Sequence, residues 1–185
     1  MRRYLLLILL AIGLGLPTSS SATLVKTFSM PELVYEAHDV VRGYVTSMQA
    51  VYDPHRKHVY THTTVTVVED LRTGDKKERI VVIRQLGGSA DGIVTTLTGN
   101  ATLDLGEEVV IFARTDGVFH YMLGMSQGKY SVVRALGKTP HLQRTHNGIH
   151  GLKRSPMALP QAPDALALKA LRAQVKAYAK KEARP

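Results

Sequence analysis

Residues 58–67 read HVYTHTTVTV, and β-branched valine and threonine fill seven of these positions. Successive side chains of a strand point to opposite faces, so this stretch has the period of two that a half-buried β-strand requires. Valine and threonine are also among the residue types most enriched in strands. The stretch predicts a long strand. Val59 and Tyr60 are both acceptable core residues, so the pattern leaves open which face of the strand is buried.

Further segments of strand-like composition lie on both sides of this stretch. They cover residues 40–51, 79–85, 93–97, 108–114, 118–123 and 129–134. Residues 72–75 and 115–117 supply the glycine and polar side chains that tight connections between antiparallel strands use. Short strands at this spacing favour a small antiparallel barrel, with a β-sandwich as the alternative.

A helix start precedes the first of these strands. Ser29 is a good N-cap, Pro31 suits the first turn, and Glu32 stands where a capping box places its acidic residue. The signals predict a short N-terminal helix that ends near His38.

Charge divides the chain into two parts. Residues 23–133 carry eleven basic and thirteen acidic side chains, whereas residues 134–185 carry eleven basic and two acidic ones. Residues 134–163 are rich in Gly, Pro, His and Arg, which predicts an extended basic linker. Residues 164–182 have apolar side chains at helical spacing and predict an amphipathic C-terminal helix.

This predicted helix carries a cationic stripe beside its apolar one. The stripe consists of Lys169, Arg172, Lys176 and Lys180. A helix of this kind binds an acidic protein or lies on an anionic envelope surface, and we take the four residues as a candidate binding site. The alternative is a terminal helix whose leucine face docks on its own domain while its lysines face solvent.

Residues 1–22 resemble a secretory signal peptide. Arg2 and Arg3 precede an uncharged run from residue 4 to residue 16, and Ser20 and Ala22 provide the small side chains of a cleavage site. We expect a mature chain that begins near Thr23 and is exported to the periplasm or the medium. The alternatives are a twin-arginine signal and an uncleaved membrane anchor, and no other segment is long enough to cross a bilayer.

Composition excludes several classes of site. The chain has no cysteine, which rules out disulfides, thiolate metal sites, cysteine nucleophiles and a lipid anchor on cysteine. It has no tryptophan and three phenylalanines, so aromatic platforms for single-stranded nucleic acid are few. We expect no cofactor and regard nucleic acid as an unfavoured partner.

Histidines offer the densest candidate metal cluster. His55 and His58 could converge across a turn, and imidazole is a good ligand for zinc or copper. His62 shares a strand face with His58 but lies about 13 Å from it, too far for one ion. An exposed polar strand face is the alternative explanation.

Residues 124–128 read GMSQG, a literal match to the G-x-S-x-G pattern of serine hydrolases. A nucleophile elbow needs a strand before it and a helix after it. A strand-like segment follows instead, so we interpret the match as a turn and propose no catalytic Ser126. We interpret the glycine-rich residues 87–92 likewise as a flexible turn, because no helix begins there to hold a phosphate.

One resemblance covers residues 30–133. Residues 37–45 (AHDVVRGYV), 106–112 (GEEVVIF) and 127–130 (QGKY) resemble a class of uncharacterised exported bacterial β-domains. Their order is also loosely similar to netrin-like and tissue-inhibitor-of-metalloproteinase domains, which implies an OB-type five-stranded barrel with helices. Those inhibitors use an N-terminal cysteine that this chain lacks, so the resemblance transfers no inhibitory residue.

Together these observations favour an exported binding domain over an enzyme. The ligand would contact the barrel face or the basic tail. A small metal-dependent or hydrolytic exported enzyme is one alternative, and a structural envelope protein whose tail helix completes the fold is the other.

Overall fold

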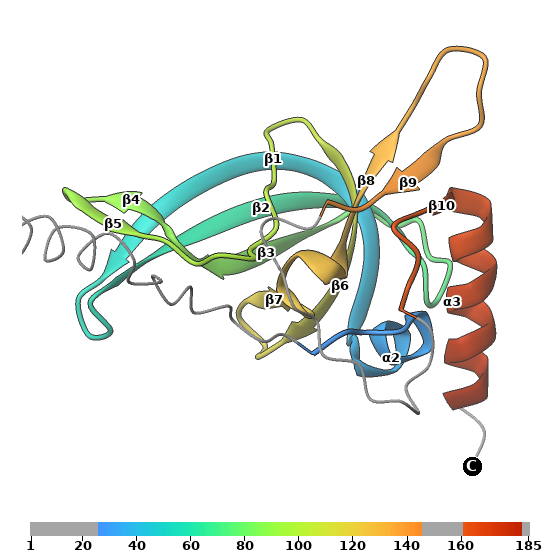
Figure 1. The fold of residues 1–185 in the computed structure, drawn as a ribbon, viewed down its shortest axis with the longest axis horizontal. Helices are drawn as coiled ribbons and strands as arrows, with labels where there is room; N and C mark the ends of the chain where they lie inside the picture. The colour runs from blue at the N-terminus through green and yellow to red at the C-terminus, as the bar shows by residue number, and fades with distance from the viewer. Residues whose placement is uncertain (1–25, 146–160, 183–185) are drawn as a thin grey trace, which may run out of the picture.

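The computed structural model describes residues 26–145 and 161–182, and the expected signal peptide lies outside them. Figure 1 shows two long curved strands that reach a small hairpin at one end of the molecule, with both helices at the other end. In chain order the elements are α2 (Met30–Glu36), β1 (Asp39–Asp53), β2 (His58–Asp70), β3 (Arg79–Leu86), β4 (Gly88–Ala90), β5 (Ile93–Thr95), β6 (Glu108–Thr115), β7 (His120–Met122), the 3-10 turn η1 (Met125–Gly128), β8 (Lys129–Val133), β9 (His141–Gln143), β10 (Ala165–Ala167) and α3 (Leu168–Glu182).

Five strands close into a barrel in the order β1-β2-β3-β7-β6 and back to β1. β1 pairs antiparallel with β2 along almost its whole length and with β6 through its first half. β7 pairs antiparallel with β6, and a single parallel pair, Ile83 with His120, joins β3 to β7. The fold is therefore mainly β and is the small OB-like barrel expected from the sequence, with one parallel seam. Because the two edges meet, the sandwich alternative is excluded.

Strong bending of β1 makes this closure possible. The register of the β1–β2 pair shifts between Arg42 and Gly43 and again between Val45 and Ser47, as β-bulges produce. At Gly43 the two strands approach so closely that an added Cβ atom would lie 2.4 Å from the carbonyl oxygen of Thr66. Only glycine fits this position without moving a strand.

Alternation along the strands produces two separate cores. β6 is buried at its first six positions because it faces a different core on each side. Val109 and Ile111 point into the barrel, where they join the inward residues of β1, β2 and β3. Val110 and Phe112 point outward into a second cluster with α2 and α3.

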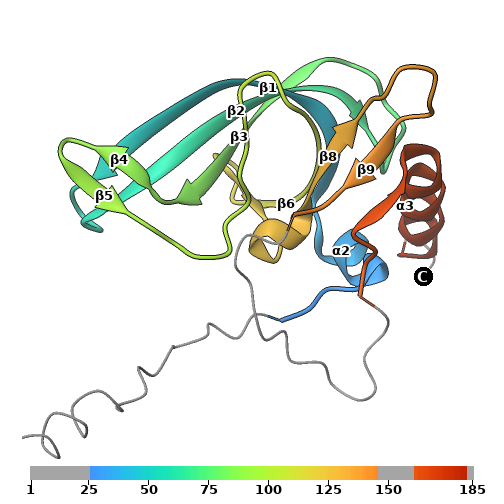
Figure 2. The same cartoon turned by 45° about the horizontal axis from the view of Figure 1, so that its top comes forward.

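The outer cluster holds both helices against the barrel. Ser29 and Glu32 form the predicted capping box of α2, and Leu33 of this helix is fully buried. Leu171 and Val175 of α3 are fully buried in the same cluster. The predicted amphipathic helix thus docks its apolar face on its own domain, beside β8 and β9 (Figure 2).

The segment predicted as a linker contributes to this packing. Within residues 134–163, β9 pairs with β8 and β10, and Leu142 is fully buried. The Arg144 guanidinium is buried too, donating to the Ala162 carbonyl at 3.2 Å and to the Tyr130 hydroxyl. The sequence of this segment lacks apolar periodicity, and β9, which lies between β8 and β10, has only three residues, too few to show a period.

Candidate binding site

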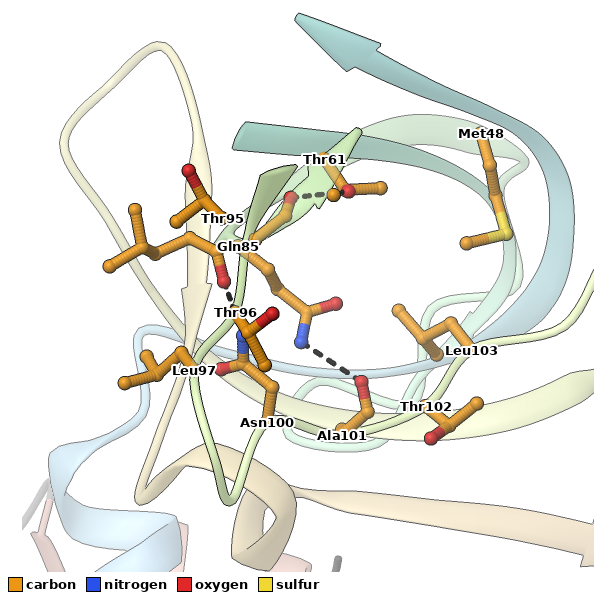
Figure 3. Close-up of a pocket in the computed structure, with 13 residues that line it drawn as sticks. Met48, Thr61, Gln85, Thr95, Thr96, Leu97, Asn100, Ala101, Thr102 and Leu103 are labelled. Carbon is orange, nitrogen blue, oxygen red and sulfur yellow. Dashed lines mark hydrogen bonds between the residues drawn. The ribbon is translucent and has the colours of Figure 1, made fainter. Parts of the chain in front are cut away.

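A hollow of about 270 Å³ opens at the end of the barrel, and we call it the barrel mouth. It lies between the inner face of β1, β2 and β3 and the segment that follows the β4–β5 hairpin (Figure 3). The residues that line it are Met48, Thr61, Gln85, Leu86, Gly87, Gly88, Thr95, Thr96, Leu97, Asn100, Ala101, Thr102 and Leu103.

Strand alternation directs three of these side chains inward. Thr61 pairs with Gln85 across β2 and β3, and Met48 pairs with the buried Thr63 across β1 and β2. Paired residues share a face of the sheet, so all three project toward the inside. Leu103 belongs both to the mouth and to the barrel core, so the hollow continues the interior toward solvent.

Hydrogen bonds fix the far wall of the mouth. The Gln85 side-chain amide donates to the Ala101 carbonyl at 3.0 Å, and the Asn100 amide donates to the Leu86 carbonyl. The Thr61 hydroxyl donates to the Gly87 carbonyl at 2.8 Å. These three polar side chains therefore hold the walls of the mouth together.

The glycine-rich residues 87–92 form a different structure from the flexible turn expected. They build β4 and the turn of the β4–β5 hairpin, with Asp91 and Gly92 at positive φ. A Cβ atom added at Gly88 would lie 2.7 Å from the Thr61 hydroxyl, so the absence of a side chain lets the hairpin lie against β2. These glycines position a wall of the mouth rather than a phosphate.

The mouth is uncharged. None of its thirteen described lining residues is acidic, basic or a histidine. General acid–base catalysis needs a group that can exchange a proton, and the binding of a charged ligand needs a counter-charge. The arrangement suits a neutral ligand held by shape and apolar contact.

The cationic stripe of α3 divides into side chains with different roles. Arg172 donates to both carboxylate oxygens of Glu69, at 2.7 and 2.6 Å. Lys169, Lys176 and Lys180 are exposed. The structure therefore gives Arg172 an intramolecular partner and leaves the three lysines at the surface.

Glu69 is one member of a chain of alternating charges on the outside of the barrel. Arg42 lies 3.1 Å from Glu69 and 3.2 Å from Glu108, and Arg134 donates to both oxygens of Glu108. Burial alone would raise the pKa of Glu69, but the hydrogen bonds and charge of Arg172, aided by Arg42, hold it below its usual range. This network ties α3 to β1 and β2.

The histidines considered as candidate metal ligands lie in two different settings. His55 and His58 are exposed at the β1–β2 turn, and the His62 ring stacks on Phe119 with centroids 4.7 Å apart. Burial, with the nearby Arg84 charge, lowers the pKa of His62. Within residues 26–145 and 161–182 no group of three His, Asp or Glu side chains could hold a metal ion.

The His62 ring is part of a stack that closes the barrel from outside. The Arg84 guanidinium lies 4.0 Å from the Tyr60 ring centroid and 5.1 Å from that of Phe119. Phe119 comes from the turn between β6 and β7, so the stack joins β2 and β3 to β7 across the single-pair seam. We assign it a structural role because its groups already contact one another.

Two serines could be mistaken for nucleophiles. Ser126 lies in the 3-10 turn η1, is 1% exposed and precedes strand β8, which agrees with the interpretation of GMSQG as a turn. The Ser131 hydroxyl donates to Glu107 at 2.6 Å and accepts from the Lys129 ammonium at 2.9 Å. Lys129 also donates to Glu107, so the three side chains bond to one another.

The sequence contained only a partial signal for the barrel mouth. The alternation of residues 58–67 shows that Thr61 shares a face with Val59 and Val65, but the apposition of residues 96–103 depends on long-range contacts. No helix in the described ranges combines the length and hydropathy of a membrane span. The chain matches no family model, and comparisons with curated proteins and solved structures gave no match.

Proposed function

We propose that this chain is an exported, non-catalytic interaction domain, acting in the periplasm or outside the cell, whose barrel mouth receives an uncharged apolar segment of a partner protein. The uncharged hollow at the open end of the barrel carries the proposal. Export is supported by residues 1–22, which read as a signal peptide.

The size of the mouth supports a side-chain ligand. A dry cavity of about 150 Å³ can hold a benzene molecule, so about 270 Å³ has room for one large or two smaller apolar side chains. Mouths of β-barrels are also among the places where concave binding sites occur most often.

Exposed apolar atoms at the mouth support contact with a protein. Met48 and Leu97 line the hollow and are 43% and 38% exposed. Covering such side chains removes apolar surface from water, at about 25 cal/mol per Å². Since Thr61, Gln85 and Asn100 already bond to the walls, these side chains leave apolar contact as the main interaction for a ligand.

The alternative of a hydrolytic enzyme gains no support from the site. The mouth contains no titratable side chain, and the Ser131 cluster uses its lysine and glutamate to bind each other. The alternative of a structural protein shares one observation with our proposal, because α3 does complete the fold.

Titration with single-residue probes tests the proposal. N-acetyl-leucine amide and N-acetyl-methionine amide are expected to shift the backbone NMR signals of residues 96–103 with millimolar affinity, and N-acetyl-lysine amide is not. Leu97→Asp should weaken these shifts at least about fivefold, since it places a charge in an uncharged site. Val118→Asp is the matched control, because Val118 is 72% exposed on the β6–β7 turn.

Equal binding of the neutral and charged probes would contradict the proposal. So would shifts that do not map to the mouth, or unchanged binding by the Leu97→Asp variant. Hydrogen–deuterium exchange on each variant establishes that the barrel remains folded.

A further inference from the structure

A second concave site lies where α3 meets the barrel. The hollow measures about 370 Å³ and is bounded by α3 on one side and by the end of β2 with the β2–β3 connection on the other. We call it the basic cleft. Its lining residues are Glu69, Leu71, Gly74, Lys76, Arg172, Ala173 and Lys176.

Cations dominate this cleft. Lys76, Arg172 and Lys176 contribute three positive charges, and Glu69 contributes the single negative charge among the lining residues. Arg42 and Arg172 both bind the Glu69 carboxylate, so its charge is already compensated from inside the protein. The excess positive charge of the cleft therefore lies on Lys76 and Lys176.

Among the described residues, neither lysine of the cleft contacts a carboxylate directly, although the charge of Lys76 acts on nearby Glu69. In the described part of the chain, no ion pair or hydrogen bond involves the ammonium of Lys76 or Lys176. Two carboxylates lie near Lys76 in the sequence: Asp70 is held by Arg79 at 3.2 Å and by the backbone N–H groups of Arg72 and Thr73, and Asp75 accepts from the backbone N–H of Lys77 at 2.9 Å.

Lys176 reaches from the helix to the opposite wall. Its ammonium lies against Gly74, where an added Cβ atom would be 3.4 Å from Nζ. Gly74 has a φ of +81°, so the turn that receives the lysine has a conformation glycine adopts readily. The ammonium groups of Lys76 and Lys176 therefore both border one hollow that two chain segments form.

We propose that the basic cleft binds a phosphate-class anion between Lys76 and Lys176, beside the Arg172 guanidinium whose Nε and Nη2 already hold Glu69. Charge-assisted hydrogen bonds from ammonium and guanidinium groups to phosphate oxygens are the strongest polar contacts that these side chains make. The basic cleft shares no lining residue with the barrel mouth, so the test of one proposal does not decide the other. Because both walls contribute cations, the bound anion also holds α3 on the barrel.

A pair of charge-matched variants tests the proposal. Lys76→Gln combined with Lys176→Gln removes two cleft charges, and Lys169→Gln combined with Lys180→Gln removes two exposed charges of the same helix outside the cleft. Pyrophosphate is titrated into the full chain at constant ionic strength, with chloride as the balancing anion, and both calorimetry and the melting temperature are recorded.

We expect pyrophosphate to bind and to raise the melting temperature of the wild type and of the Lys169/Lys180 variant. The cleft variant should bind at least about tenfold more weakly, since it loses two charge-assisted contacts. Equal weakening in both variants would show general electrostatic attraction and overturn the proposal, as would the absence of a pyrophosphate effect on the wild type.

Flotation with vesicles identifies the source of the anion. Vesicles of phosphatidylglycerol and phosphatidylcholine are compared with phosphatidylcholine alone, using the same two variants. Binding to the anionic vesicles that only the cleft variant loses assigns a lipid headgroup to the site, and pyrophosphate binding without vesicle binding assigns a soluble phosphate. Vesicle binding that only the Lys169/Lys180 variant loses, together with no pyrophosphate effect, overturns the proposal.

Discussion

The docking of α3 makes the strongest prediction about stability. Leu171 is fully buried in the outer cluster, together with Leu33 of α2 and Phe112 of β6. Replacing a fully buried leucine with alanine costs about 2–5 kcal/mol, from lost transfer free energy and from the cavity left behind. Since about 1 kcal/mol shifts the melting temperature of a chain of this size by roughly 2–4 °C, Leu171→Ala should lower it by about 4–20 °C.

The same variant should unfold in one transition. The cluster that contains Leu171 also contains barrel strand residues, so helix and barrel share their main stabilising contacts. Far-ultraviolet circular dichroism follows the helix, and the near-ultraviolet tyrosine signal follows the fully buried Tyr130. Lys169→Ala is the control, because an exposed helix position should change stability by less than about 0.5 kcal/mol.

Two results would refute this reasoning. One is a melting temperature that Leu171→Ala changes no more than Lys169→Ala does. The other is a helical signal that disappears well before the tyrosine signal, which would mean that α3 is a separate appendage.

Two further predictions concern the barrel. Gly43→Ala should destabilise the chain by at least about 1–3 kcal/mol in urea unfolding, because the new Cβ atom would lie 2.4 Å from the Thr66 carbonyl oxygen; a neutral effect would show that the bulge can relax. Asp39 has its pKa lowered to about 2, chiefly by hydrogen bonds from His120 and from Arg79, against the opposing effect of burial. Asp39 should contribute about 2 kcal/mol to the free energy of unfolding above pH ~4, the pKa of an aspartate in the unfolded chain, and this contribution should be lost as the pH falls toward 2. The Asp39→Asn variant should therefore show a smaller decrease of the urea midpoint on acidification. An identical pH profile for wild type and variant would contradict this assignment.

Local sequence signals predicted most of the elements. The alternation of residues 58–67 predicted a strand, and these residues form most of β2. Ser29 and Glu32 form the capping box of α2, as predicted. The apolar spacing of Leu171 and Val175 predicted α3. These features depend on neighbours within a few residues, which a sequence displays directly.

Features that depend on distant residues were not visible in the sequence. β9 has only three residues, and its pairing with Ala165–Ala167 joins two segments of unremarkable composition. Arg172 binds Glu69, and only the folded chain brings these two positions together. The cationic stripe that the sequence displays therefore includes one residue that forms an ion pair within the protein. Lys76 likewise gives no sign in the sequence that it shares a cleft with Lys176.

The shared cluster of α2 and α3 also sets the order in which the chain can mature. Leu33 is near the start of the described chain and Leu171 near its end, yet each covers part of the same buried surface. A chain still under synthesis can form the β1–β2 hairpin but cannot cover its first helix. The outer cluster therefore closes only after Leu168–Glu182 has joined it, and until then a chain that emerges from its N-terminus, at the ribosome or across a membrane, leaves the α2 face of the cluster uncovered.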